Sequence, residues 1–112
     1  MALAFETVRF QINNETGVNV DSISKGFERR IREDDEHRQV VQVAIQSFKL
    51  DLAGGATAHP TDVVQVTADL QDVGAEEVTV RVKTNYSGGP YSGEVVVLII
   101  ADLVDRPGAP IN

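Results

Sequence analysis

The fold of this chain is decided by residues 63–103, which read VVQVTADLQDVGAEEVTVRVKTNYSGGPYSGEVVVLIIADL. In two segments of this stretch, 63–73 and 78–83, apolar and polar residues alternate with the two-residue period of a half-buried strand. The polar side of these segments holds Gln65, Thr67, Asp69, Thr79, Arg81 and Lys83. A third segment, 94–103, carries the unbroken apolar run VVVLII, so both of its faces must be covered. We therefore predict three successive strands, the last of which is either a central strand or a strand at a subunit contact.

Three further strand-like segments precede this stretch. Residues 5–13 and 40–52 alternate in the same way, and a β-bulge near Ser47 would keep the apolar residues that follow it on one side. Residues 27–33 fit a strand, although their charged side chains also tolerate a short helix. We prefer the strand, because too few residues there could form an apolar helix face.

Turn and loop residues separate the predicted strands. Glycine, asparagine, aspartate and proline, which favour turns, are frequent between them. The sequence predicts a surface loop at 14–23, a charged connection at 33–37, a flexible loop at 53–61, and turns at 72–76 and 87–93. We therefore expect one domain over residues 1–104, followed by a short tail at 105–112.

Six short strands with polar turns and hardly a helical segment predict an all-β fold, namely a six-stranded antiparallel β-sandwich or a small barrel. Two three-stranded sheets that face each other would cover the apolar faces of these strands. Only the last strand, 94–103, keeps surplus apolar surface. A partner subunit is one way to cover it.

Composition restricts the class of protein and of partner. The 112 residues are enough to bury about two thirds of the surface that the unfolded chain exposes, and the absence of cysteine excludes disulfides. The 17 acidic and 10 basic residues give a net charge of −7, which repels nucleic acid and anionic lipid, so a neutral ligand is expected. Without a signal peptide or a long apolar run, the sequence predicts a soluble protein with no membrane insertion.

No constellation for catalysis stands out. Nucleophilic catalysis would need His37 or His59, neither of which lies near a nucleophile motif, and both are read more simply as exposed loop residues. The acidic run 33–36 could bind calcium, but it lacks the ligand spacing and the turn glycine of a loop site, so a solvated hairpin tip is the preferred interpretation. We therefore predict that the protein is not an enzyme and uses no cofactor.

Polar and aromatic residues flank the glycine-rich turn. They are Thr84, Asn85, Tyr86, Tyr91 and Ser92. An aromatic face can stack on the apolar face of a sugar ring while amide and carboxylate oxygens fix its hydroxyl groups, so this end of the sandwich is a candidate site for a polar neutral ligand. The alternative interpretation is that both tyrosines simply close the core where the strands end.

Three segments carry a more specific pattern: VVQVAIQSFKLD, VVQVTADLQDV and VTVRVKTNYSGGPYSGEVVVLIIADL. A strand that ends in Leu-Asp is followed by a strand with a V-x-A-x-L-x-x-V rhythm and then by a threonine-led loop that ends in Tyr-Ser. The residues concerned are Leu50 and Asp51, then Val66, Ala68, Leu70 and Val73, then Thr84 with Tyr91 and Ser92. In this order of segments, residues 19–103 resemble the H-type lectin family, which includes the snail agglutinin and the carboxy-terminal domain of discoidin.

The resemblance implies a six-stranded antiparallel β-sandwich that forms a homotrimer and binds galactose or N-acetylgalactosamine near the protomer junctions. Matched position by position, the family's sugar-binding tyrosine falls on Tyr91 and its acidic loop residue falls near Asp21. The family's tryptophan aligns with Asn85, the neighbouring histidine with Tyr86, and its strand arginine with Gln65. These departures remove a stacking face and a multidentate donor, and Tyr86 could supply the lost stacking.

Two functions from different classes follow. The first is a non-enzymatic carbohydrate-binding module in which trimerisation supplies the avidity that one shallow sugar site lacks. Its predicted ligand-binding residues are Asp21, Gln65, Asn85, Tyr86 and Tyr91. The second is a structural or attachment module, in which the same trimer holds a larger assembly such as a fibre or tail tip and binds no sugar.

Overall fold

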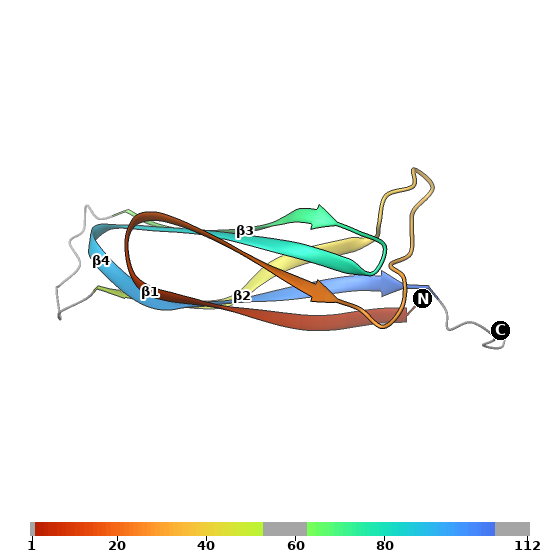
Figure 1. Cartoon of the computed structure of the whole chain (residues 1–112), viewed down its shortest axis with the longest axis horizontal. Coiled ribbons are helices and arrows are strands. Elements are labelled where there is room, and N and C mark those ends of the chain that lie inside the picture. The colour runs from red at the N-terminus through yellow and green to blue at the C-terminus, as the bar shows by residue number, and fades with distance from the viewer. Residues whose placement is uncertain (1, 53–62, 105–112) are drawn as a thin grey trace.

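The computed structural model describes residues 2–52 and 63–104, and within these ranges its regular secondary structure consists of β-strands alone. Four long strands follow one another: β1 (Ala2–Gly26), β2 (Val41–Leu52), β3 (Val64–Val73) and β4 (Glu77–Leu103) (Figure 1). All pairings are antiparallel and the sheet is not closed. The predicted all-β antiparallel fold is confirmed, with four long strands in place of six short ones. The expected loop at 53–61 and the tail at 105–112 lie outside the described residues.

Strand β4 is the centre of the sheet, because β1, β2 and β3 each pair with it. β1 pairs along nearly the whole of one edge of β4, from Ala2 opposite Leu103 to Gly26 opposite Glu77. β2 and β3 occupy the other edge, one at each end of β4. The apolar run at 95–100 therefore lies in a central strand, which was one of the two predicted positions.

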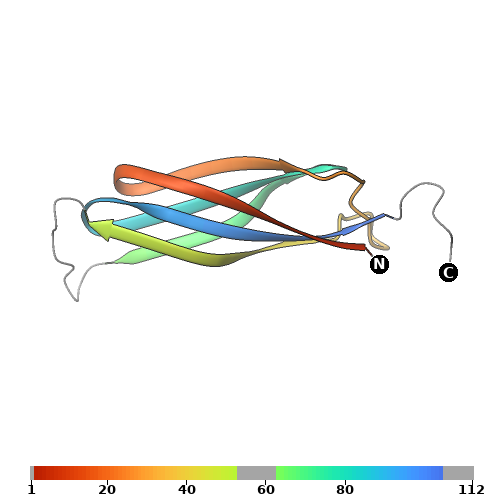
Figure 2. The ribbon, with the colours of Figure 1, turned by 90° about the horizontal axis from the view of Figure 1, so that it is seen from below.

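Strands β1 and β4 double back on themselves at the same end of the molecule (Figures 1 and 2). The bend in β1 coincides with two register shifts and with positive φ angles at Asn14 (50°) and Gly17 (71°). In β4 it coincides with a φ of 137° at Gly89. Glycine reaches this left-handed region without steric cost and asparagine tolerates it, so both strands bend where their sequence permits.

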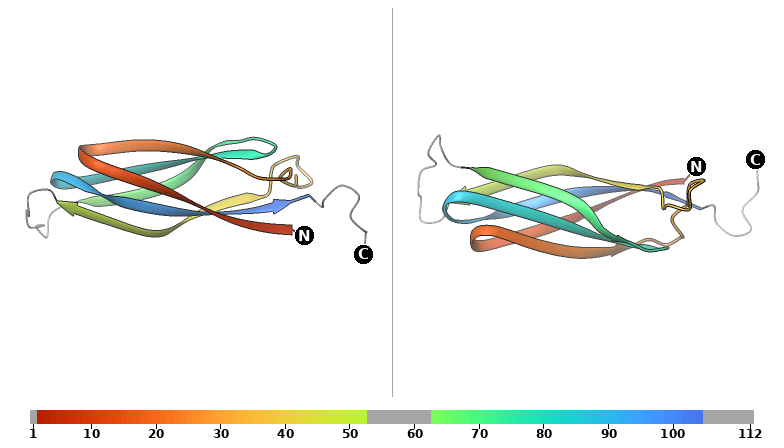
Figure 3. Two further views of the ribbon diagram at one scale, coloured as in Figure 1. Left: turned by 60° about the horizontal axis from the view of Figure 1, so that its bottom comes forward. Right: turned by 90° about the horizontal axis from the view of Figure 1, so that it is seen from above.

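The bends fold the single sheet into two layers (Figures 2 and 3). The first layer contains residues 2–12 of β1, residues 91–103 of β4, and β2. The second layer contains residues 17–26 of β1, residues 77–86 of β4, and β3. Each layer thus has a limb of β4 in the middle and an open edge on either side.

One hydrophobic core fills the space between the layers. Its fully buried members include Phe10, Val95, Val97 and Ile99 from the first layer and Val78, Val80 and Val82 from the second. Alternate residues of these strands point inward, as the two-residue period predicted. Each of these side chains stabilises the fold by about 1.5–3 kcal/mol relative to an exposed position.

The prediction of a surface loop at 14–23 is wrong, since residues 17–26 form the second limb of β1. The order of polar and apolar residues in this limb is the reverse of the one expected for a strand that packs on a core. Val18 and Val20 point outward, whereas Asn19 and Asp21 lie opposite the buried Thr84 and Val82 and so share the inward side. Polar residues are tolerated there because β1 is an edge strand, and charged residues on the inward side of an edge also discourage pairing with a further strand.

The prediction that a turn at 87–93 separates two strands is also wrong, because β4 continues through these residues. Tyr91 pairs with Glu15 of β1 and with Leu52 of β2, so the bend stays inside the sheet. The predictions for the neighbouring elements are confirmed. The turn between β3 and β4 lies within 72–76, and β2 has a register shift between Ile45 and Ser47.

Residues 27–40 cross from the second layer to the first and form neither the preferred strand nor the alternative helix. They contain only isolated bridges, from Ile31 to Leu103 and from Glu33 to Gln39. Ile31 is buried and closes this end of the core. The acidic run at 33–36 lies at the exposed tip, in agreement with the hairpin interpretation, and backbone hydrogen bonds from Arg38 and Glu36 lower the pKa of Asp34.

Asp102 binds the connection formed by residues 27–40 to the sheet. Its carboxylate accepts hydrogen bonds from Arg32 Nε (2.6 Å) and from the backbone amide of Ala2 (3.2 Å). Burial by itself would raise the pKa of Asp102, but the hydrogen bonds and the positive charge of Arg32 outweigh it, so the pKa lies below its usual value. The ion pair therefore joins the start of β1, the end of β4 and the connection between the layers.

Gly93 is the position where the backbones of β2 and β4 require glycine. A Cβ atom there would run into the carbonyl oxygen of Lys49. We expect Gly93→Ala to lower the free energy of unfolding by about 1–3 kcal/mol or more, measured by urea denaturation, because the backbone of β2 has to move. The matched control is Gly26→Ala, since nothing lies within 4 Å of its Cβ position. Equal stabilities of the two variants would contradict this close approach.

Candidate functional site

Two of the five predicted site residues, Gln65 and Asn85, lie side by side on the surface. They pair directly across β3 and β4. Directly paired residues share a face, and their neighbours Val66 and Tyr86 pack in the core, so both amides point outward from the second layer. Val18 of β1 pairs with Asn85 from the other edge and completes this row of the sheet.

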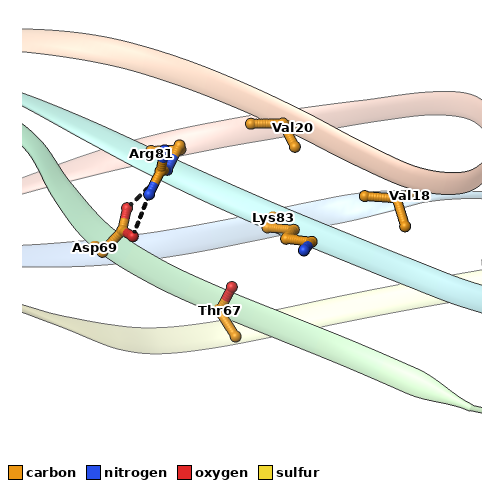
Figure 4. Close-up of a pocket in the computed structure, with 6 residues that line it drawn as sticks. All are labelled: Val18, Val20, Thr67, Asp69, Arg81 and Lys83. Carbon is orange, nitrogen blue, oxygen red and sulfur yellow. Dashed lines mark hydrogen bonds and ion pairs between the residues drawn. The ribbon is translucent and has the colours of Figure 1, made fainter.

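The same outward surface continues along the strands as a depression of about 310 Å³ (Figure 4). Three strands contribute to its lining, which consists of Val18, Val20, Thr67, Asp69, Arg81 and Lys83. Gln65 and Asn85 lie two positions from Thr67 and Lys83 on the same strands and therefore extend the depression at one end. We call these eight residues the polar face.

An ion pair with fixed geometry lies at the other end of the polar face. Arg81 donates from Nε to Asp69 Oδ1 (3.1 Å) and from Nη2 to Asp69 Oδ2 (2.7 Å) (Figure 4). These hydrogen bonds are the main cause that lowers the pKa of Asp69 and raises the pKa of Arg81. Both groups stay charged near neutral pH, and their two parallel bonds hold the remaining guanidinium donors of Arg81 in one orientation.

The apolar part of the polar face comes from β1. Val18 and Val20 are 56% and 52% exposed, which is unusual for valine in a strand. Val18 pairs with Asn85 and Val20 with Lys83 on the neighbouring β4 limb. The polar face therefore offers hydrogen-bonding groups on two strands and an apolar wall on the third.

The two tyrosines of the predicted site lie in the core. Tyr91 is 0% exposed, and its hydroxyl donates to the carbonyl oxygen of Gly17 (2.7 Å) and lies 3.1 Å from the hydroxyl of Thr84. Tyr86 is also buried, and the centroids of the two rings are 6.2 Å apart. These positions agree with the alternative interpretation, in which the tyrosines close the core where the strands bend.

Asp21, the remaining predicted residue, is separated from the amides by the sheet. It pairs with Val82, whose side chain is in the core, so Asp21 points to the side opposite the polar face. Its side chain is exposed at the edge and accepts a hydrogen bond from Asn19 Nδ2 (3.2 Å). The structure thus brings together Gln65 and Asn85 and leaves the other three predicted residues elsewhere.

The polar face contains residues that the sequence did not single out. Alternation had already placed Gln65, Thr67 and Asp69 on one side of their strand and Arg81 and Lys83 on one side of the next. The missing information was the strand register, which makes Asp69 the direct partner of Arg81. Val18 and Val20 had no comparable signal, because their strand was read as a loop.

A second depression, of about 430 Å³, lies on the first layer near the bend. Its lining includes Gln11, Lys49, Ser92 and Glu94. Here the charged groups already have partners: Glu94 accepts from Arg9 (2.7 Å), and Lys49 lies 3.6 Å from Asp51. The polar face is the better candidate, because no side-chain hydrogen bond of Gln65 or Asn85 is found within residues 2–52 and 63–104.

Two negative findings apply to residues 2–52 and 63–104. These ranges contain no cluster of three or more histidine, cysteine, aspartate or glutamate side chains arranged to hold a metal ion. They also contain no helix that is long and apolar enough to span a membrane.

The hydroxyl of Tyr91 provides a test of the packing at the bend. Tyr91→Phe should lower the free energy of unfolding by about 1–3 kcal/mol in thermal or chemical denaturation, because it leaves the carbonyl oxygen of Gly17 and the buried Thr84 hydroxyl without their partner. Tyr86→Phe is the matched control, since no hydrogen bond of the Tyr86 hydroxyl is found in the described residues, and its stability should change little. A larger loss in the control would contradict this assignment.

The polar face combines two amides, an ion pair of fixed geometry and an apolar wall. Family models, curated proteins and solved structures were all compared with this chain, and none of them matches it.

Proposed function

We propose that this protein is a non-enzymatic carbohydrate-binding module that acts as a homotrimer, with the polar face as its ligand site. The observation that carries the proposal is the composition of that face. Gln65, Thr67 and Asn85 supply amide and hydroxyl groups, and the Asp69–Arg81 pair supplies charged acceptors and donors in a fixed geometry. Sugar hydroxyl groups need such paired donors and acceptors.

The exposed valines supply the second requirement of a sugar site. One face of a pyranose ring is largely apolar, and in many sites an aromatic ring covers it. Val18 and Val20 offer an aliphatic surface of this kind beside the polar groups. A site without an aromatic ring should bind weakly, which fits a module that gains avidity by presenting several copies.

The proposal also draws on the resemblance to the H-type lectin family. Each layer has three antiparallel strand segments, and the two layers enclose one core, as in the six-stranded sandwich that the resemblance implies. The proposed site differs from the one that the resemblance implies. It keeps Gln65 and Asn85 but excludes Tyr86 and Tyr91, because neither aromatic ring is accessible from the polar face.

A structural or attachment module is the second candidate, and a different surface favours it. The outward side of the first layer carries Leu3 and Phe5 from β1 and Val96, Leu98 and Ile100 from β4, which pair or neighbour one another in the sheet. We call these five residues the apolar face. Leu3 and Phe5 are 50% and 60% exposed, whereas Val96 is 9% exposed, so the β1 side of the apolar face is uncovered in the single chain and suits contact with another copy.

The proposed trimer can be tested on the apolar face. Phe5→Asp should convert the trimer to a monomer with an unchanged far-ultraviolet circular dichroism spectrum, measured together with mass by light scattering, because a buried aspartate without a partner is costly at a subunit contact. Val18→Asp is the matched control, since Val18 lies on the same strand and is 56% exposed but belongs to the second layer. A wild-type monomer, or a trimer that persists in Phe5→Asp, would refute this role of the apolar face.

The carbohydrate proposal is tested by a glycan-array screen of the purified, fluorescently labelled oligomer, with galactose and N-acetylgalactosamine glycans included. We expect binding to a defined glycan class, reduced about fivefold or more in the Gln65→Ala/Asn85→Ala double variant, because two amides lose their contacts, each worth about 0.5–1.5 kcal/mol. Gln46→Ala removes an exposed amide from β2 and should bind as the wild type does. No binding by a folded oligomer would favour the structural module instead.

A further inference from the structure

We infer that the ligand of the polar face carries a single anionic group, and that Lys83 is the residue that selects it. This inference rests on the proposed function, since it names the class of carbohydrate that the same site takes. It follows from the balance of charge within the depression and from the position of its two cations.

Two cations and one anion line the depression: Arg81, Lys83 and Asp69. Arg81 and Asp69 neutralise each other through their two hydrogen bonds. Lys83 has no such partner, because no carboxylate lies within ion-pair distance of its ammonium group in the part of the chain that the structure describes. The depression therefore has a net charge of about +1 in a chain whose net charge is −7.

The surroundings of Lys83 fit an anionic group on a sugar better than a free ion. Lys83 pairs with Val20 on one side and with Thr67 on the other, so an apolar and a hydroxyl-bearing neighbour flank its side chain (Figure 4). Asn85, two positions along β4, adds an amide on the same side. A ring that packs on the valine side can present its charged substituent to the ammonium group and its hydroxyl groups to Thr67 and Asn85.

The charge of the whole chain limits how many negative charges the ligand can carry. A net charge of −7 repels polyanions such as nucleic acids and heavily sulfated polysaccharides over long distances. One negative charge suffers little of this repulsion and can be neutralised by one lysine. The expected ligand class is therefore a saccharide with one carboxylate or one sulfate on the ring that enters the depression.

The inference is tested with matched sugars that differ only in charge. Galactose-terminated, galacturonate-terminated and 6-sulfogalactose-terminated forms of one oligosaccharide are immobilised at equal density, and equilibrium binding of the oligomer is measured. We expect at least about tenfold tighter binding to one of the two acidic forms than to the neutral form. Preference for the carboxylate or for the sulfate identifies the anionic group, whereas equal or tighter binding to the neutral sugar would overturn the inference.

Lysine variants assign the preference to Lys83. Lys83→Gln removes the charge and should lower binding of the acidic sugar to the level that the same variant shows for the neutral sugar, whereas Lys83→Arg should retain the preference. Lys49→Gln, which removes an exposed lysine from the first layer, is the control and should behave as the wild type does. A preference that survives in Lys83→Gln would refute the role of Lys83.

These results separate the inference from the proposed function. If the neutral and acidic sugars bind equally, and the Gln65→Ala/Asn85→Ala variant loses both, the polar face is a sugar site and only the inference fails. If the folded oligomer binds none of the three sugars and no glycan on the array, the proposed function fails, and the inference fails with it.

Discussion

In the described part of the chain, each of the other three strands depends on hydrogen bonds to β4. β1 pairs with one of its edges, and β2 and β3 share the other, so neither layer has a central strand of its own apart from a limb of β4. This requirement explains why β4 must bend without breaking. It also explains Gly93, because β2 approaches the backbone of β4 too closely there for any side chain.

Both the polar face and the buried tyrosines are consequences of the bend. Inward alternation places Tyr86 and Tyr91 on either side of Gly89, where both rings fill the end of the core. Outward alternation along the same limb places Arg81, Lys83 and Asn85 in one row. The outward side chains of this limb of β4 thus form part of the candidate site, and its inward side chains form part of the core.

The sequence predicted those parts of the fold that follow from local pattern. The strands at 64–73 and 41–52, the bulge near Ser47 and the inward residues of β4 all have a clear two-residue period. It could not reveal the second limb of β1, because an edge strand can carry Asn19 and Asp21 on its inward side and valines on its outward side. The candidate site could be predicted only in part. Composition indicated the amides and the tyrosines, but the strand register, which the sequence does not reveal, decides which side chains lie together.

The topology also determines when the chain can fold. Of the pairings that β4 makes, only the one with β3 joins segments that are adjacent in sequence, through the short turn after Val73. β1 meets its partner across as many as a hundred residues, since Ala2 lies opposite Leu103. Contacts of such long range form slowly, because the closure of large loops costs entropy before any contact repays it. On the ribosome, β1 and β2 must therefore wait with their apolar residues unpaired until the strand that organises them has been synthesised.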